Sequence, residues 1–349
     1  VITQKEFVID VAVAPGQTIK LAKKSYSTHH GPMIIIPGSF EWGPGGSAFA
    51  IKDVNLGNVD IIDHWLAMNL AGNIAEFEQA FQDYDGVIFN NTMSADSEGN
   101  VYYVDDSPVP YLTDIALKEM TTNPLLIGAK QAAGFTILPG FLSAFDFERA
   151  VPYANAPKYS GTDYVQNSND SFWLTNLNAP ITGISPLYGK VENEQSLRSR
   201  MAHKLLADSA GSDGLFNLQE LELALLNNRS YLAEDILAEL LSICQAQGST
   251  AVVLGAGNID ISSGCSALAL WDGTMNKNSS SAHLFREFAF LFAQNPQWQQ
   301  GFAVDSATTT PKGLVNNTTT LEQFTQAIVN VESAGFALDA TLGSVQFVE

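Results

Sequence analysis

Apolar and polar positions in the first fifty residues follow the short-period pattern of β-strands. Apolar runs occur at Phe7–Val13, Thr18–Leu21 and Met33–Ile36, and Pro-Gly or Gly-Pro pairs separate them. Proline and glycine interrupt strands and form turns, so each run has clear limits. The pattern predicts three strands in a small β-rich subdomain over residues 1–50.

Residues 59–83 change to a helical period. Their apolar positions are three and four residues apart, which predicts two helices, the second beginning near Asn73. A β-hairpin pattern follows, with strands at Gly86–Met93 and Val101–Val104 joined by a glycine-containing turn. Residues 107–160 contain many prolines and little periodicity. We therefore expect a long irregular segment there.

Most of the remaining chain has helical spacing. Asn217, with Glu220 three residues later, forms a capping-box signature for the start of one helix. Five helices are predicted, at Gln195–Asp208, Asn217–Asn227, Ala233–Gln247, 283–293 and 321–335. The strands lie mostly before the helices and do not alternate with them, so the expected fold class is α+β.

Composition limits the classes of function. The chain has 349 residues, of which 46% are hydrophobic, as in globular proteins. Its net charge of −20 argues against nucleic-acid binding, which needs clustered Lys and Arg. No apolar stretch reaches the ~20 residues of a membrane-spanning helix, and the start of the chain lacks the layout of a signal peptide.

One polar run is the strongest candidate for chemistry. Asp163-Tyr-Val-Gln-Asn-Ser-Asn-Asp-Ser-Phe-Trp-Leu-Thr-Asn176 has no periodicity of a strand or a helix. An Asn-x-Asn turn that projects a carboxamide N–H into a cleft is one way to build an oxyanion hole. By residue type alone, Asn167 and Asn169 can equally cap a turn.

This run, with Gly183-Ile-Ser-Pro-Leu187 after it, resembles the asparagine-rich segment in the β subunit of the penicillin acylase family. Those enzymes are N-terminal-nucleophile (Ntn) hydrolases, and the N-acyl-homoserine lactone acylases and aculeacin-type acylases are the members it resembles most. Weaker similarities follow in order along the chain, at Tyr26–Met33, Phe49–Asp53, Ala95–Asn100, Tyr103–Pro110, Leu268–Gly273, Phe285–Phe288 and Thr310–Gly313.

The resemblance implies a partial αββα Ntn-hydrolase sandwich with a small N-terminal β subdomain and a helical insertion. We divide the chain accordingly into residues 1–50, a sheet and helix segment at 51–194, a mainly helical insertion at 195–340 and a return toward the sheet at 341–349.

The resemblance also implies roles for two polar residues. Asn169 corresponds to the asparagine whose side-chain N–H stabilises the oxyanion, and Arg198 corresponds to the arginine that orients this asparagine. Arg200 is a competing choice for the arginine, because it lies two residues further along the same predicted helix. A surface arginine at the start of a helix is the alternative interpretation of Arg198.

Trp65 and Phe89 lie where the family places aromatic residues that line the acyl pocket. Phe89 stands where the lactone acylases tend to have tryptophan, which leaves the preferred acyl-chain length open. Without the resemblance, both side chains would be interpreted as core aromatics. An apolar pocket with few polar groups is what recognition of a fatty amide requires.

The resemblance further implies a disulfide between Cys244 and Cys265, which would fit a periplasmic or secreted enzyme. The alternative is two buried free thiols. No metal or cofactor is expected in this chain, because the family's Ca²⁺ ligands would lie mostly outside it. Acidic pairs such as Asp105-Asp106 are interpreted as solvated turns. His29 and His30 are rejected as catalytic or metal-binding, because neighbouring strand residues face opposite sides.

The expected function is hydrolysis of an N-acyl amide bond, in an N-acyl-homoserine lactone, a penicillin or a lipopeptide. The family's nucleophile is the first residue of the β chain, whereas this sequence begins with Val1. We expect an internal fragment that is inactive alone and pairs with the α subunit and the remaining β-subunit segments of its precursor. The alternative is a non-catalytic secreted binding module on a vestigial Ntn scaffold.

Overall fold

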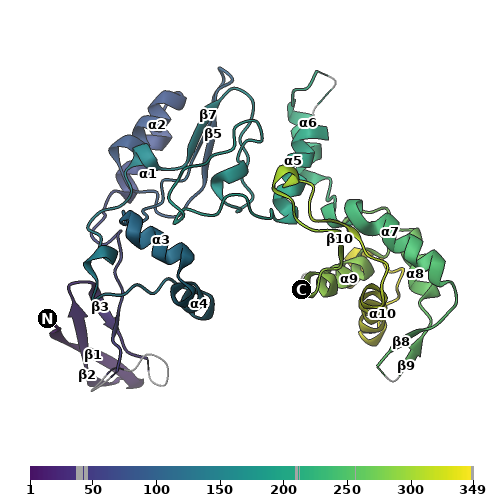
Figure 1. Cartoon of the computed structure of the whole chain (residues 1–349), viewed down its shortest axis with the longest axis horizontal. Coiled ribbons are helices and arrows are strands. Elements are labelled where there is room, and N and C mark those ends of the chain that lie inside the picture. The colour runs from purple at the N-terminus through teal and green to yellow at the C-terminus, as the bar shows by residue number, and fades with distance from the viewer. Residues whose placement is uncertain (37–41, 43–45, 209–210, 212, 256, 347–349) are drawn as a thin grey trace. The chain divides into compact units, whose positions relative to one another are not determined.

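The structure is a computed structural model that describes residues 1–36, 42, 46–208, 211, 213–255 and 257–346. The chain forms two compact units, shown in Figure 1. The first contains Val1–Val165 and Ala179–Gly189, and the second contains Gln166–Asn178 and Lys190–Glu349. In the described parts, no helix combines the length and apolarity needed to cross a lipid bilayer.

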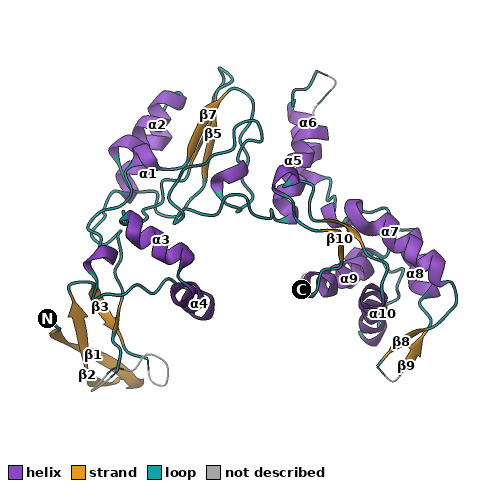
Figure 2. Ribbon diagram, viewed as in Figure 1, coloured by secondary structure: helices purple, strands orange, loops and turns teal. Residues whose placement is uncertain are grey.

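The first unit begins with a four-stranded antiparallel sheet in the order β1-β2-β3-β4 (Figure 2). Its long hairpin is formed by β1 (Thr3–Ala14) and β2 (Gln17–Thr28), and the short strands are β3 (Gly31–Ile34) and β4 (Phe49–Ala50). The three predicted strands are confirmed, although β3 ends before Ile36. Most side chains of the β1–β2 hairpin are exposed, and the last four residues of β2 are half-buried.

A second sheet in this unit has the order β5-β6-β7. Its strands are β5 (Thr92–Ala95), β6 (Val101–Val104) and β7 (Lys158–Gly161), and helices α1 (Ile61–Leu70) and α2 (Ile74–Asp83) precede them in the chain. As predicted, α2 starts after an N-cap at Asn73, whose side chain accepts a hydrogen bond from the backbone of Glu76. Helix and sheet share a core that contains Ile74, Phe81, Val87, Tyr102 and Val104.

The predicted strand at Gly86–Met93 is wrong for most of its length, because β5 begins only at Thr92. The chain before β5 is instead tied to the start of α1. The backbone N–H of Gly86 donates to Nδ1 of His64 (3.0 Å), and the carbonyl of Asp85 accepts from Asn58 (2.7 Å). These contacts take up backbone groups that a strand would pair with its neighbour.

The irregular segment predicted at 107–160 is also wrong in part, because it contains helices α3 (Asp114–Thr122) and α4 (Pro124–Ala133). Thr113 and Asn123 cap their first turns by accepting backbone hydrogen bonds. Pro124 is the first residue of α4, where proline lacks only a hydrogen bond that the helix does not make. Proline therefore begins a helix here, whereas the prediction treated it as a breaker.

The second unit is mainly helical. Its helices are α5 (Leu197–Asp208), α6 (Leu218–Leu226), α7 (Tyr231–Gln247), α8 (Ser262–Ala269), α9 (Ala282–Gln294), α10 (Thr318–Ser333) and α11 (Leu342–Val345). The five predicted helices are confirmed, and the capping box of Asn217 and Glu220 is present at α6. Two hairpins complete the unit, formed by β8 (Val252–Leu254) with β9 (Gly257–Ile259) and β10 (Trp298–Gln300) with β11 (Lys312–Leu314).

Short 3-10 helices occur in both units, at Ser143–Phe145, Tyr153–Asn155, Phe172–Leu174 and Val304–Ser306. The main core of the second unit gathers aromatic and aliphatic side chains from α7, α8, α9 and α10. Its fully buried members include Ile236, Leu240, Leu268, Phe285, Phe288 and Ile328.

A disulfide joins Cys244 of α7 to Cys265 of α8, with the two Cα atoms 5.6 Å apart. Closing a loop of this length stabilises a fold by about 3 kcal/mol, chiefly by restricting the unfolded chain. We expect Cys244→Ala/Cys265→Ala to lower the free energy of unfolding by about 2–4 kcal/mol, measured by urea denaturation. Dithiothreitol should destabilise the parent protein and leave the double variant unchanged; equal effects on both would contradict the prediction.

Candidate active site

The asparagine loop, residues 166–170, is shaped by one of its own side chains. Oδ1 of Asn167 accepts from the backbone N–H of Asn169 (2.8 Å), and Nδ2 of Asn167 donates to the carbonyl of Asp170 (3.0 Å). Asn169 has φ +66°, a left-handed conformation that asparagine adopts more readily than most residues. Asn167 therefore forms the turn, and the side chain of Asn169 is available for another contact.

Arg198 of α5 makes that contact. Its Nη2 donates to Oδ1 of Asn169 (2.5 Å) and to the carbonyl of Ser168. Arginine carries donors alone, so the Asn169 atom that faces it is the oxygen, and the amide nitrogen points the other way. Within the described residues, Nδ2 of Asn169 makes no hydrogen bond. The pair thus presents two N–H donors outward from a fixed carboxamide.

Two further residues, which the sequence analysis missed, attach the loop to α5. Asp170 accepts from both the backbone N–H (2.9 Å) and the hydroxyl (2.7 Å) of Ser196 through one carboxylate oxygen. The Ser196 hydroxyl in turn accepts from the backbone of Ser199 (3.2 Å), so it caps the first turn of α5. Serine is a preferred N-cap residue, so Ser196 near the start of the predicted helix Gln195–Asp208 was the available signal.

Beyond the loop, the chain is anchored by a buried 3-10 turn at Phe172–Leu174. The side chains of Trp173 and Leu174 pack with Ala307 and the half-buried Phe302. The hydroxyl of Ser171 donates to the carbonyl of Lys190. The aromatic end of the polar run is therefore structural, whereas its asparagine end lies at the surface of this unit.

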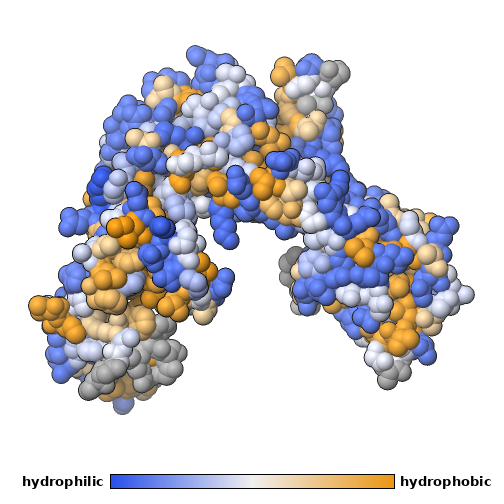
Figure 3. All heavy atoms as spheres, in the orientation of Figure 1, coloured by the Kyte–Doolittle hydropathy of each residue, from blue (hydrophilic) through white to orange (hydrophobic). Residues whose placement is uncertain are grey.

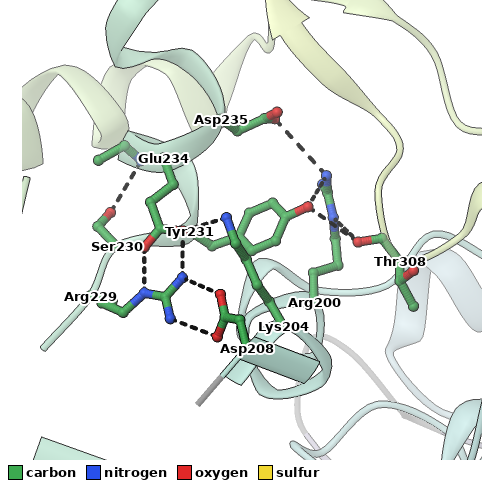
Figure 4. A network of polar contacts seen from close by, with 10 residues as sticks. Arg200, Lys204, Asp208, Arg229, Ser230, Tyr231, Glu234, Asp235 and Thr308 are labelled. Atoms are coloured by element: carbon green, nitrogen blue, oxygen red, sulfur yellow. Dashed lines mark hydrogen bonds and ion pairs between the residues drawn. The ribbon is translucent and has the colours of Figure 1, made fainter. Parts of the chain in front are cut away.

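Arg200 was the competing choice for the positioning arginine, and the structure excludes it from this role. Two residues along a helix turn a side chain by about 200°, so Arg200 points into the protein. It is 1% exposed, donates to the Tyr231 hydroxyl (2.9 Å) and the Thr308 carbonyl (3.2 Å), and lies 4.0 Å from Asp235 (Figure 4). Arg198 alone of the two contacts Asn169.

Sequence comparison identifies the family. The family model for penicillin amidase matches residues 2–349. The chain belongs to the penicillin amidase family. Acyl-homoserine lactone acylase PvdQ of Pseudomonas fluorescens (strain Pf0-1) is 29% identical over 323 residues, which are 90% of this chain and 39% of that protein. Aculeacin-A acylase of Actinoplanes utahensis is 31% identical over 314 residues, or 85% of this chain and 39% of that protein.

The chain therefore spans about two fifths of the length of these penicillin amidase relatives. Among solved structures, a thermostable penicillin G acylase from Alcaligenes faecalis matches with a TM-score of 0.54 and 15% identity, over 95% of this chain and 60% of that one. This likeness confirms the α+β class and the Ntn-hydrolase fold expected from the sequence.

The two aromatic residues expected to line the acyl pocket of this penicillin amidase homologue lie in the first unit. Trp65 is on α1 and is 45% exposed; Phe89 follows the α2 helix and is 78% exposed. The contact between Gly86 and His64 places their two segments side by side. Neither aromatic side chain is part of the core of the described residues, so the core interpretation is wrong for both.

The acidic pair Asp105-Asp106 is not a solvated turn. Asp106 is 6% exposed, and Oδ2 of its carboxyl has no hydrogen-bond partner within the described part of the chain. Burial, with the nearby negative charge of Asp85, raises the pKa of Asp106 to about 7. Asp105 differs, because its Oδ1 accepts from both the backbone and the hydroxyl of Ser107.

The raised pKa of Asp106 gives a stability prediction with a definite sign. The folded state holds the proton up to a pH of about 7, whereas the unfolded carboxyl releases it near its ordinary pKa of 3.8. Stability should therefore fall as pH rises from about 4 to 7. We expect Asp106→Asn to be more stable than the parent by about 1–3 kcal/mol above pH 7 and equal to it below pH 4. Urea denaturation across this range tests it; parallel pH curves would contradict it.

His29 and His30 do converge, contrary to the sequence-based argument, because they lie in the turn after β2. Their rings are 3.7 Å apart, and with Asp146 they offer three ligand atoms within 4.8 Å. Nε2 of His30 bonds to the carbonyl of Gly140 (2.9 Å), which leaves Nδ1 toward Asp146. However, the Lys52 ammonium already pairs with this carboxylate and lowers the pKa of Asp146. We assign the cluster to a structural ion pair.

The other histidines occupy buried structural positions. Nδ1 of His64 accepts from Gly86, and burial lowers the pKa of His64 to about 4. His283 bonds through Nε2 to the carbonyl of Ala337 (2.9 Å). His203 contacts the asparagine loop itself, through Gln166.

Proposed function

We propose that this chain supplies the oxyanion site of an amidohydrolase that cleaves the amide bond of N-acyl compounds. The observation that carries the proposal is the Arg198–Asn169 contact, which fixes the carboxamide oxygen and leaves the amide N–H groups as donors. N-acyl-homoserine lactones are the leading substrate class, because acylases with that name from several Pseudomonas strains share 26–29% identity with the chain. Lipopeptide and penicillin side chains are the next classes.

The chemistry follows from the charge that develops during acyl transfer. Attack on the amide carbonyl places a negative charge on its oxygen, and the N–H of Asn169 donates to this oxygen. The Arg198 guanidinium prevents the carboxamide from rotating, so the donor needs no reorganisation when the charge appears. We propose that the nucleophilic serine comes from another segment of the precursor, so that this chain alone is inactive. No metal or cofactor takes part in these steps.

We propose that Trp65 and Phe89 line the acyl pocket and set the preferred chain length. A larger side chain at residue 89 should shorten the pocket. We expect Phe89→Trp to lower kcat/KM for a twelve-carbon acyl chain by about tenfold relative to an eight-carbon chain, since each buried methylene contributes about 0.8 kcal/mol. Steady-state hydrolysis of the two substrates tests it, with Phe290→Trp, an exposed position of the second unit, as the matched control. An unchanged ratio would remove Phe89 from the pocket.

Large exposed apolar side chains support a further proposal about partners. On α1, Ile62 is 76% and Leu70 73% exposed, and Figure 3 shows apolar groups at the surface of the first unit. Leu66, midway between them in the sequence, is 54% exposed, and exposed apolar side chains that recur every four residues along a helix are typical of an interface. We propose that the α subunit and the remaining β-subunit segments of the same precursor cover it. The disulfide supports a periplasmic or secreted location.

The test of the proposed function uses the full-length, processed protein. It is incubated with N-acyl-homoserine lactones of six to fourteen acyl carbons, with a penicillin and with a lipopeptide, and released amine is measured. Mass spectrometry separates amide cleavage, which gives a free fatty acid, from opening of the lactone ring. Amine release from at least one class supports an acylase. Saturable binding of these compounds without any amine release would favour a non-catalytic binding module.

A further inference from the structure

The base of the asparagine loop is held by a part-buried contact between two residues that lie 37 positions apart in the chain. Gln166 donates through Nε2 to the carbonyl of Leu174 (3.1 Å), and its backbone N–H donates to the carbonyl of Thr175 (3.0 Å). The same Nε2 lies 2.8 Å from Nε2 of His203 on α5. Both ends of the polar run therefore meet at Gln166.

The protonation state of His203 follows from this geometry. The amide nitrogen of Gln166 has two hydrogens and no lone pair for accepting, so with one hydrogen on Leu174 the other points at the imidazole. With the Gln166 carboxamide in this orientation, Nε2 of His203 is unprotonated and acts as the acceptor. His203 is 5% exposed, and burial lowers the pKa of its imidazole to about 4, which keeps the ring neutral near physiological pH.

The contact also has a cost that a purely space-filling residue would avoid. Nδ1 of His203 and Oε1 of Gln166 are buried and have no hydrogen-bond partner within the described residues. Leaving such a group unpaired costs about 1–3 kcal/mol. An apolar side chain at 203 would remove the cost of the unpaired Nδ1, so the contact with Gln166 is the property that the imidazole adds.

We propose that His203 is a positioning residue for the oxyanion site: its neutral Nε2 holds Gln166, and through it the base of the asparagine loop, against α5. This inference rests on the proposed function of Asn169. Helix α5 then holds the loop at three places, at Asp170 through Ser196, at Asn169 through Arg198, and at Gln166 through His203. A loop released at its base lets the Asn169 donor shift, and a shift of about 1 Å is enough to slow catalysis.

The experiment measures kcat and KM per active site in the full-length, processed protein, with active sites counted by titration. We expect His203→Phe, which keeps a planar ring, though a larger one, and removes the acceptor, to lower kcat about 10- to 100-fold and leave KM within about twofold. His203→Gln places an acceptor near the Nε2 position and should restore most of kcat. His203→Asn places its carboxamide near Nδ1, cannot reach Gln166, and should not.

A double-mutant cycle separates positioning from folding. Gln166→Met removes the donor from the loop side and leaves α5 intact. Because it also removes the bond to the Leu174 carbonyl, we expect it to slow kcat at least as much as His203→Phe does. The double variant should be no slower than Gln166→Met, because that variant already lacks the contact with His203. If His203→Phe does not fold, Gln166→Met decides alone.

Three outcomes overturn the inference: full kcat in Gln166→Met, equal kcat in His203→Gln and His203→Asn, or rate losses that multiply in the double variant. Failure of the proposed function is distinguishable from all of these. In that case the parent protein itself releases no amine from any N-acyl substrate, or Asn169→Gly hydrolyses amides at the parent rate.

Discussion

Asn169→Gly is expected to lower kcat for amide hydrolysis by about 10²–10³, the usual loss when one oxyanion donor is removed. Glycine is the appropriate replacement because Asn169 has φ +66°, which alanine adopts only with strain. The expected loss therefore reports the missing carboxamide and not a distorted turn. Steady-state kinetics of amine release in the full-length protein measure it, and KM should change little.

Asn169→Asp is the matched control for the role of Nδ2, the amide nitrogen of Asn169. It keeps the left-handed turn and the oxygen that accepts from Arg198, and it replaces the outward N–H donors by a carboxylate oxygen. We expect Asn169→Asp to be at least as slow as Asn169→Gly, because a negative charge then faces the developing oxyanion. A rate for Asn169→Asp near that of the parent would show that the donor plays no part in the reaction.

Arg200→Met is expected to lower the free energy of unfolding by about 3–5 kcal/mol. The buried guanidinium stacks on the Tyr231 ring, 4.3 Å from its centroid, and donates to the Thr308 carbonyl. Its removal takes one of two donors from that carbonyl, which keeps only the Tyr231 hydroxyl (3.2 Å). It also removes the positive charge beside the half-buried Asp235, a charge that in the parent opposes the effect of burial on the Asp235 pKa. Urea denaturation of the folded protein gives the measurement.

Arg198→Met provides the crossed control, because the two arginines lie on one helix with opposite environments. Arg198 is exposed and contacts the asparagine loop. We expect the free energy of unfolding of Arg198→Met to stay within about 1 kcal/mol of the parent value, because exposed polar contacts contribute little to stability. The same variant should lose most of its amide-hydrolysis activity. Equal losses of stability in both variants would contradict the division of roles between Arg198 and Arg200.

Local signals in the sequence predicted local structure well. The caps at Asn73 and at Asn217 with Glu220 depend on side chains within four residues of the backbone groups they satisfy, so spacing alone locates them. The motif around Asn169 was recognised through its resemblance to the penicillin acylase family, because by residue type alone its asparagines could equally cap a turn. Proline was misleading at Pro124, because its effect depends on whether it begins a helix or interrupts one.

Contacts between distant segments were beyond local reasoning. Gly86 pairs with His64 and not with a strand, and Gln166 meets His203 across 37 positions of the chain. The choice between Arg198 and Arg200 also required the structure, because the sequence does not say which face of α5 is buried. His29 and His30 converge because they lie in a turn, whereas the argument against them assumed the extended backbone of a strand.

The most direct test of the oxyanion role is the affinity of an alkyl boronic acid for the parent protein and for Asn169→Gly. Such a compound forms a tetrahedral adduct with a nucleophilic serine and places a boron-bound oxygen where the oxyanion develops. Because a transition-state analogue feels the same interactions as the transition state, its inhibition constant should rise by about the factor by which kcat/KM falls, roughly 10²–10³. Unchanged affinity for the boronic acid, together with slow hydrolysis, would contradict the assignment of Asn169 as the oxyanion donor.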